Sequence, residues 1–144
     1  MSERGVSLIE LCVVLAMIGI LCAVAVPGWG ALAARHQHRA VVMEIASELR
    51  MARQLAMARH ERIRVVVNAD QSSLRTECVE CGAIPLRWYY FAQRGTVIES
   101  MTTKPEITFH PSGRSATATT ITLSDPRQGR QALTVSLTGR VVVL

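Results

Sequence analysis

The stretch of sequence that decides the fold is RGVSLIELCVVLAMIGILCAVAVP, residues 4–27. It carries one carboxylate, Glu10, and it overlaps residues 11–34, a run without any charged side chain. At about 1.5 Å per helical residue this run is long enough to cross a hydrocarbon core of about 30 Å. The apolar core of a secretory signal is shorter, about 7–15 residues. A retained membrane-spanning helix is therefore predicted.

Three residues of this stretch have properties that predict a local structure or a reaction. Gly5 has no side chain, so the peptide bond after it fits a narrow protease site. A carboxylate such as Glu10 costs up to about 2.5–3.5 kcal/mol inside a membrane, and taken alone it predicts an interfacial side chain that reaches water. Pro27 removes an amide donor and clashes with the preceding turn, which predicts a kink in the helix.

The junction from Arg4 to Glu10 and the apolar run after it resemble the prepilin N-methylation motif of type IV pilins and type II secretion pseudopilins. Val6 stands where that family usually has phenylalanine. The resemblance implies that residues 1–5 are a leader, cleaved between Gly5 and Val6 by a prepilin peptidase/methyltransferase that methylates Val6. It also implies that residues 6–34 form a transmembrane assembly helix, in which Glu10 faces the N-terminal ammonium of a neighbouring subunit.

The same resemblance implies a single-pass protein of the inner membrane with its head in the periplasm, incorporated into a pseudopilus or pilus. Charge counting points the other way, because Arg35 and Arg39 follow the span whereas Glu3 and Arg4 cancel before it. We adopt the orientation that the resemblance implies, with the head in the periplasm, since dedicated machinery inserts such segments.

Residues 35–62 continue the helix as an amphipathic half. Apolar residues recur there at spacings of three and four, the period of one helical face: Val42, Ile45, Leu49, Ala52 and Ala56. His36, His38 and His60 lie beside this stripe without a cysteine or carboxylate at a recognisable ligand spacing. We therefore expect solvated histidines and no metal site.

Residues 63–144 change to short β-branched or aromatic runs separated by turn residues. The runs are residues 63–67, 86–91, 106–110, 118–123, 132–137 and 140–144, and the last two are joined by Thr138-Gly139 as a hairpin. This meander predicts six to eight strands in one or two antiparallel sheets. The expected fold class is α+β, a pilin-like long N-terminal helix packed on an antiparallel β-rich head.

Three short motifs extend the resemblance to the head. They are ARQLAMARHERI (52–63), FHPSGRS (109–115) and LTVSLTGRVVV (133–143), and their layout is similar to that of the GspH/FimT family. The resemblance implies a minor pilin or pseudopilin that assembles with other pilin or pseudopilin subunits, at the tip or in the initiation complex. The motifs are shared by secretion and pilus systems and do not discriminate between them.

Cys78 and Cys81 form a CxxC motif, which has several interpretations. A thioredoxin-like site needs a helix opening at the first cysteine, but Gly82 and Pro85 follow here. No histidine follows Cys81, which argues against haem attachment, and there is no second CxxC to complete a zinc site. A structural disulfide is the first expectation, ahead of free thiols and of thiol exchange, and no cofactor is expected.

The formal net charge is +5, and four arginines near turns of the C-terminal half suggest an anion site: Arg114, Arg127, Arg130 and Arg140. Such a cluster binds phosphates in a salt-sensitive way. Some FimT-like minor pilins are implicated in DNA capture for transformation through a basic C-terminal segment, so DNA is an alternative partner. Here Arg140 is followed directly by VVVL. We therefore expect a solubilising surface before DNA binding.

Signatures of catalysis are missing from the sequence. It contains no P-loop, no GxSxG, no HExxH and no convincing Ser-His-Asp set. The protein is therefore predicted to be structural and not an enzyme.

Overall fold

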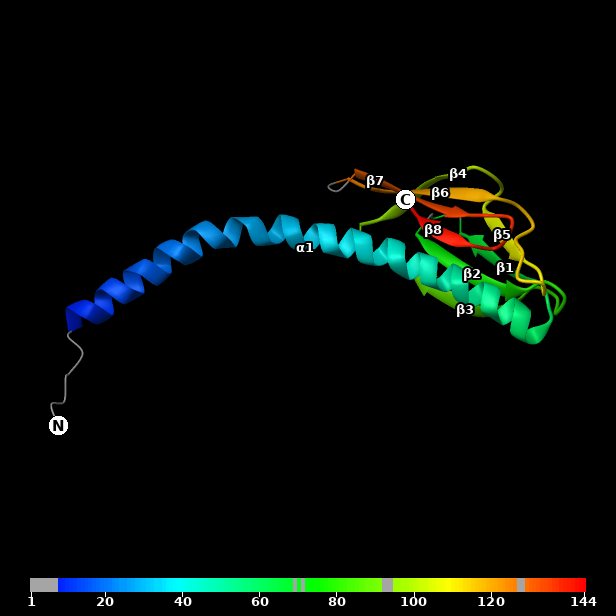
Figure 1. Ribbon diagram of the computed structural model, residues 1–144, viewed down its shortest axis with the longest axis horizontal. Coiled ribbons are helices and arrows are strands. Elements are labelled where there is room, and N and C mark those ends of the chain that lie inside the picture. The colour runs from blue at the N-terminus through cyan, green and yellow to red at the C-terminus, as the bar shows by residue number, and fades with distance from the viewer. Residues whose placement is uncertain (1–7, 69, 71, 92–94, 127–128) are drawn as a thin grey trace, which may run out of the picture. The chain divides into compact units, whose positions relative to one another are not determined.

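The computed structural model describes residues 8–68, 70, 72–91, 95–126 and 129–144, without the side chains of residues 24–35. In this part of the chain one helix, α1 (Leu8–Arg59), is followed by eight strands (Figure 1). The chain divides into two compact units, Met1–Arg35 and His36–Leu144. The helix α1 begins in the first unit and ends in the second.

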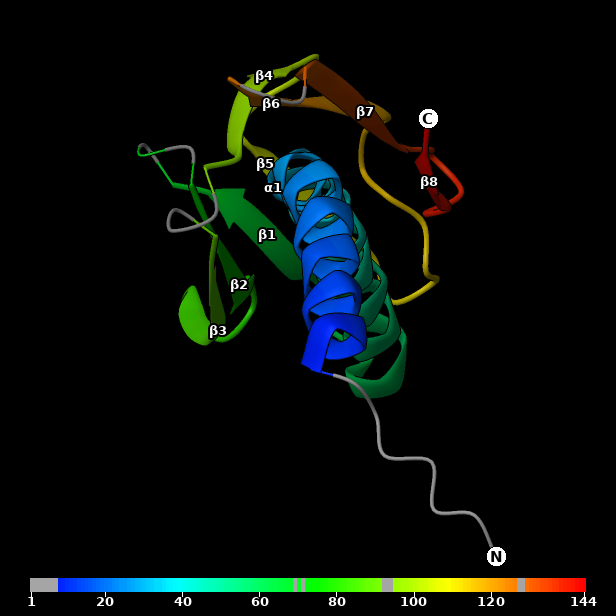
Figure 2. The same ribbon diagram turned by 90° about the vertical axis from the view of Figure 1, so that its left-hand side faces the viewer.

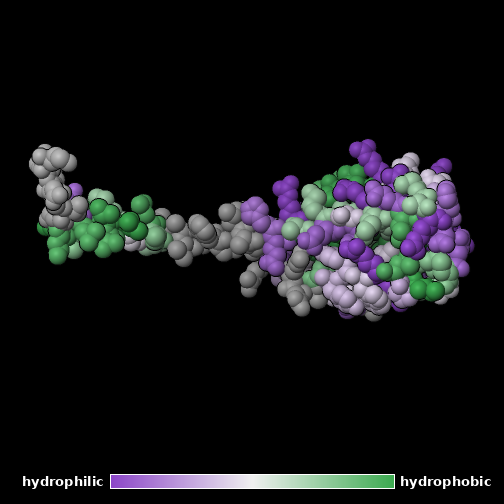
Figure 3. All heavy atoms as spheres, turned by 90° about the horizontal axis from the view of Figure 1, so that it is seen from below, coloured by the Kyte–Doolittle hydropathy of each residue, from purple (hydrophilic) through white to green (hydrophobic). Residues whose placement is uncertain are grey.

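The first unit contributes the N-terminal turns of α1. Figure 3 shows residues 8–23 as an almost continuous hydrophobic surface on the face in view, and their large apolar side chains are exposed. Among the described residues, no helical stretch is both long and apolar enough to cross a membrane. The predicted span, residues 6–34, extends beyond the described side chains. The side chain of Pro27 is also outside them, so its kink stays a prediction.

The second unit begins with the remaining turns of α1. Its residues include the strong helix formers Ala, Leu, Met, Glu and Arg, and the helix ends at Arg59, whose charge suits the negative C-terminal end of the helix dipole. His60 follows with a positive φ of 54°, the left-handed conformation that terminates many helices. Residues 60–62 then lead into the first strand.

The strands of the second unit form two antiparallel sheets. One has the order β3 (Ile84–Tyr90), β2 (Ser73–Cys78), β1 (Ile63–Val67), β5 (Glu106–Phe109). The other has the order β4 (Val97–Met101), β6 (Thr119–Asp125), β7 (Gly129–Val135), β8 (Val141–Val143). Figure 2 shows β1–β3 on one side of α1 and β7 and β8 on the other.

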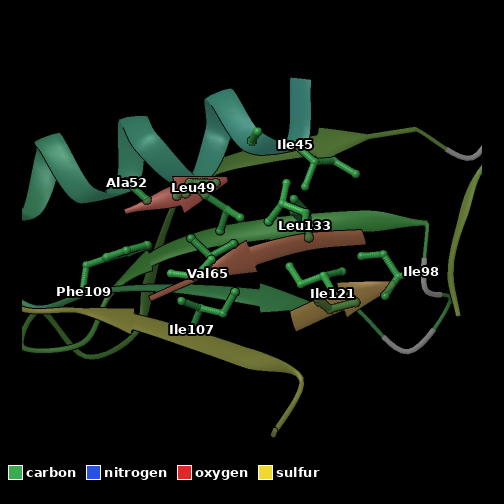
Figure 4. Packing of buried hydrophobic residues seen from close by; sticks show 14 of the residues in the cluster. Ile45, Leu49, Ala52, Val65, Ile98, Ile107, Phe109, Ile121 and Leu133 are labelled. Atoms are coloured by element: carbon green, nitrogen blue, oxygen red, sulfur yellow. The ribbon is translucent and has the colours of Figure 1, made fainter. Parts of the chain in front are cut away.

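The core lies between α1 and the inner faces of both sheets. Figure 4 shows Ile45, Leu49 and Ala52 of the helix directed toward strand residues such as Val65 and Leu133. The predicted helical stripe is confirmed, because Val42, Ile45, Leu49, Ala52 and Ala56 are all buried. The predicted α+β class, with a long N-terminal helix packed on antiparallel sheets, is confirmed as well.

Three features of the head differ from the predictions. The polar strand β2 and the strand β4 were not predicted, although β2 is central in its sheet. The order is not a simple meander, since β5 returns to pair with β1 after β4 has joined the other sheet. His38 was expected in solvent, but it is buried, and its Nδ1 lies 3.0 Å from Oγ1 of Thr96.

Candidate functional site

The N-terminal residues predicted for cleavage and assembly are described only in part. Gly5 and Val6 fall outside the described residues. Glu10 lies in the first turn of α1, and its side chain is exposed. A carboxylate at this end of a helix is favoured by the helix dipole, which places partial positive charge there. The chain therefore presents Glu10 on the surface of an apolar helix, where another molecule can reach it.

Apolar side chains surround Glu10 on this segment. Leu8 is 81 % exposed, Ile9 71 % and Leu11 55 %. Apolar patches of this kind on a soluble monomer mark membrane or protein contacts, because their exposure to water is unfavourable. The exposed apolar side chains therefore give this segment the character of a contact surface.

The four arginines of the predicted anion cluster do not form one site. Nε of Arg130 donates to Oε2 of Glu99 at 2.6 Å, and this hydrogen bond raises the pKa of the Arg130 guanidinium. Arg127 lies outside the described residues. Arg114 and Arg140 are both exposed at the opposite end of β7 from Arg130.

Two glycine turns meet at that end of the head. Gly113 and Gly139 both have positive φ, 76° and 75°, and a Cβ added to Gly139 would lie 2.0 Å from the carbonyl oxygen of Gly113. Nε of Arg53, from α1, donates to the same carbonyl oxygen at 2.8 Å. The three family-like motifs therefore converge here, each contributing one residue of the contact.

A groove runs beside this contact, between α1 and β8. It has a volume of about 530 Å³. Its lining residues are Met43, Arg50, Arg53, Gly139, Arg140, Val141, Val142 and Val143. Nη2 of Arg50 donates to the carbonyl oxygen of Val141 at 3.2 Å, which ties the helix to the edge strand. Three of the lining residues are arginines and none is acidic.

A second charged arrangement lies on the outer face of the β3-β2-β1-β5 sheet. The side chain of Glu77 is only 1 % exposed, and its Oε1 lies 2.5 Å from Nη2 of Arg64. Its Oε2 lies 3.1 Å from Nε of Arg75, an ion pair without good hydrogen-bond alignment. Arg75 also lies over the ring of Trp88, 5.6 Å from its centroid. These contacts hold a buried carboxylate between two partly exposed arginines.

Cys78 and Cys81 are joined by a disulfide at the end of β2. Oε2 of Glu61 lies 3.5 Å from Sγ of Cys78 and 3.7 Å from Sγ of Cys81. These three side chains are of metal-ligating type, but thiolate is the form that binds metal. A disulfide and a metal site therefore exclude each other, and the bonded state is the structural disulfide that the sequence predicted.

Sequence reasoning missed the residues that shape the groove. From the sequence, Arg50 and Arg53 belong to the solvent-exposed face of an amphipathic helix. The carbonyl oxygens to which they donate belong to residues 91 and 60 positions away in the chain. One local feature of the sequence could have indicated a structural role for Arg53: it belongs to the same short motif as Ala52 and Ala56 of the buried stripe.

Comparisons with known proteins agree with this architecture. The family model described as type II transport protein GspH matches residues 41–139. Among solved structures, the type IV minor pilin FimU of Pseudomonas aeruginosa (strain PAO1) aligns with a TM-score of 0.66 at 21 % identity. That alignment covers 76 % of this chain and 90 % of FimU.

The minor pseudopilin EpsH from the type II secretion system of Vibrio cholerae aligns with a TM-score of 0.60 at 12 % identity, covering 75 % of this chain and 96 % of EpsH. At sequence identities of 21 % and 12 %, these two alignments show that the chain shares the fold of FimU and EpsH. Comparison with the curated proteins found no match.

Proposed function

Because the chain belongs to the family of type II transport protein GspH, we propose that it is a minor subunit built into a type II secretion pseudopilus or a type IV pilus. The observation that carries this proposal is the first part of α1, where the carboxylate Glu10 stands among exposed apolar side chains. The segment has the surface of a helix that packs against lipid before assembly and against other helices after it.

The proposed mechanism is neutralisation of charge on assembly. Cleavage between Gly5 and Val6 frees an ammonium on Val6, which the peptidase then methylates. Pairing of that ammonium with Glu10 of an adjacent subunit relieves the cost of a carboxylate in an apolar surrounding. Each incoming subunit is thus selected by an unpaired charge on its neighbour.

The membrane and the filament position follow from the same proposal. Residues 6–34 anchor the precursor in the inner membrane with the head in the periplasm, until the subunit moves into the filament. The resemblance to minor subunits supports a place at the tip or in the initiation complex. The partners are accordingly the prepilin peptidase/methyltransferase and other pilin or pseudopilin subunits.

DNA binding for natural transformation is the alternative function. Arg130 is paired with Glu99, and Arg114 and Arg140 lie at the opposite end of β7 from it, so these three arginines of the predicted cluster do not line one surface. Sequence-independent binding of phosphates draws on several basic side chains along one surface. We therefore propose assembly ahead of DNA capture.

Glu10→Ala tests the assembly proposal. We expect the variant to be inserted and cleaved like the natural chain, but its amount in the filament fraction should fall at least tenfold, because the ammonium of the neighbour is left unpaired. Quantitative mass spectrometry of sheared filaments and of membranes measures both pools.

The matched control for this experiment is Glu99→Ala, which removes a carboxylate from an exposed ion pair in the head. Its incorporation should stay within about twofold of the natural chain, because surface pairs contribute about 1 kcal/mol or less. Equal incorporation of Glu10→Ala and the natural chain would contradict the proposed role of Glu10.

A further inference from the structure

The groove between α1 and β8 has the charge of an anion site. Arg50 and Arg140 are exposed at its surface, and none of its lining residues is acidic. In the described part of the chain, no ion pair joins Arg50, Arg53 or Arg140 to a carboxylate. Three guanidinium groups that converge without a counter-charge favour a ligand that brings its own carboxylates or phosphates.

The floor of the groove is a free sheet edge. β8 pairs with β7 on one side, where the carbonyl oxygen of Arg140 and the amide of Leu144 are bonded. Since bonding direction alternates along an antiparallel strand, Val141 and Val143 direct their backbone groups to the other side. There the carbonyl oxygen of Val141 accepts from Arg50. Among the described residues, no backbone group pairs with the amide and carbonyl of Val143, so they can bind another strand.

The groove also has apolar walls. Met43 is 43 % exposed on the helix side, and Val142 is 37 % exposed on the strand side. Arg53 does not move freely across the groove, because its Nε is held by the carbonyl oxygen of Gly113. The site is therefore held in shape by contacts from both the helix and the Gly113 turn.

We propose that this groove binds an extended acidic segment of a neighbouring pilin-like subunit. The segment pairs with the edge of β8 at Val143, its carboxylates meet Arg50 and Arg140, and its apolar side chains contact Met43 and Val142. This inference rests on the proposed function, which supplies the neighbour. A nucleic acid would use the arginines alone, whereas a peptide uses the backbone edge and the apolar walls as well.

The test uses the full-length chain with a photoreactive phenylalanine at Val142, expressed in cells that carry its own filament machinery. Irradiation should give a crosslink to another pilin-like subunit, and the crosslinked peptide, identified by mass spectrometry, should contain at least two acidic residues. The double variant Arg50→Ala/Arg140→Ala should lower the crosslink yield at least tenfold. A photoreactive residue at Tyr90, on the far edge strand β3, controls for chance contact.

Arg59→Ala is the matched arginine control, because Arg59 is exposed on the same helix and does not line the groove. Its crosslink yield should equal that of the natural chain, and thermal unfolding should show all variants folded. A nuclease-sensitive crosslink, a neutral partner peptide, or a yield unchanged by the double variant overturns the inference. Incorporation of the chain into filaments is measured in the same cells. A chain that is incorporated without forming the crosslink refutes only the proposed binding of a segment in the groove. A chain that is never incorporated refutes the proposed function.

Discussion

Gly139→Ala should lower the free energy of unfolding of the head by about 3 kcal/mol, the sum of two costs. The left-handed conformation that Gly139 adopts, at φ 75°, is less favourable by about 1–2 kcal/mol for a residue with a Cβ. Its Cβ would also meet the carbonyl oxygen of Gly113 at 2.0 Å and Nε of Arg53 at 2.9 Å, and overpacking of this kind costs about 1–3 kcal/mol. Circular dichroism of the full chain in detergent should show the melting temperature lowered by more than about 10 °C.

Gly82→Ala separates the two costs. Gly82 has a similar φ of 80°, but nothing lies within 4 Å of an added Cβ. This variant should therefore lose only the conformational part, about 1–2 kcal/mol. If both variants melt at the same temperature, the close approach of the two glycine turns does not stabilise the head as described.

Glu77→Ala should destabilise the head by about 2 kcal/mol. Removal of one partner from a buried ion pair costs about 3–5 kcal/mol when the remaining charge stays buried. Arg64 and Arg75 are 29 % and 34 % exposed, so both can recover part of their hydration, which reduces the loss. Urea unfolding followed by fluorescence, which also reports on Trp88 beside Arg75, measures the change.

The matched change is Glu80→Ala. Glu80 forms an ion pair with Arg62 in which both side chains are nearly half exposed, so its loss should cost about 1 kcal/mol or less. A Glu77→Ala variant no less stable than Glu80→Ala would mean that the buried carboxylate does not stabilise the sheet.

The parts of the fold that could be predicted from the sequence are those with strong local periodicity. The stripe Val42 to Ala56, the strand β1 and the β7–β8 hairpin follow from spacing and turn residues alone. The strand β2 reads SLRTEC and lacks a simple alternation of apolar and polar residues. Its central place depends on register with β1 and β3, including the pairing of Glu77 with Arg64 across strands. Such pairing is not encoded in any one segment.

The candidate site illustrates the same limit. Arg130 and Arg140 are close in sequence, but Arg130 lies at the start of β7 and Arg140 lies beside its other end. A strand of this length separates its ends by about 20 Å. Arg50 and Arg140 are far apart in sequence and line one groove. The residues predicted for cleavage and assembly are not subject to this limit. The resemblance that marks Gly5, Val6 and Glu10 comes from one contiguous motif and needs no tertiary contact.

Mass spectrometry of the N-terminus of the chain recovered from purified filaments tests the proposed subunit role most directly. We expect a chain that begins at a methylated Val6, copurifies with the other subunits, and is absent from the filaments when Gly5→Val blocks cleavage. A filament fraction that contains the chain with residues 1–5 still attached, or a correctly processed chain that never enters the filaments, would contradict it.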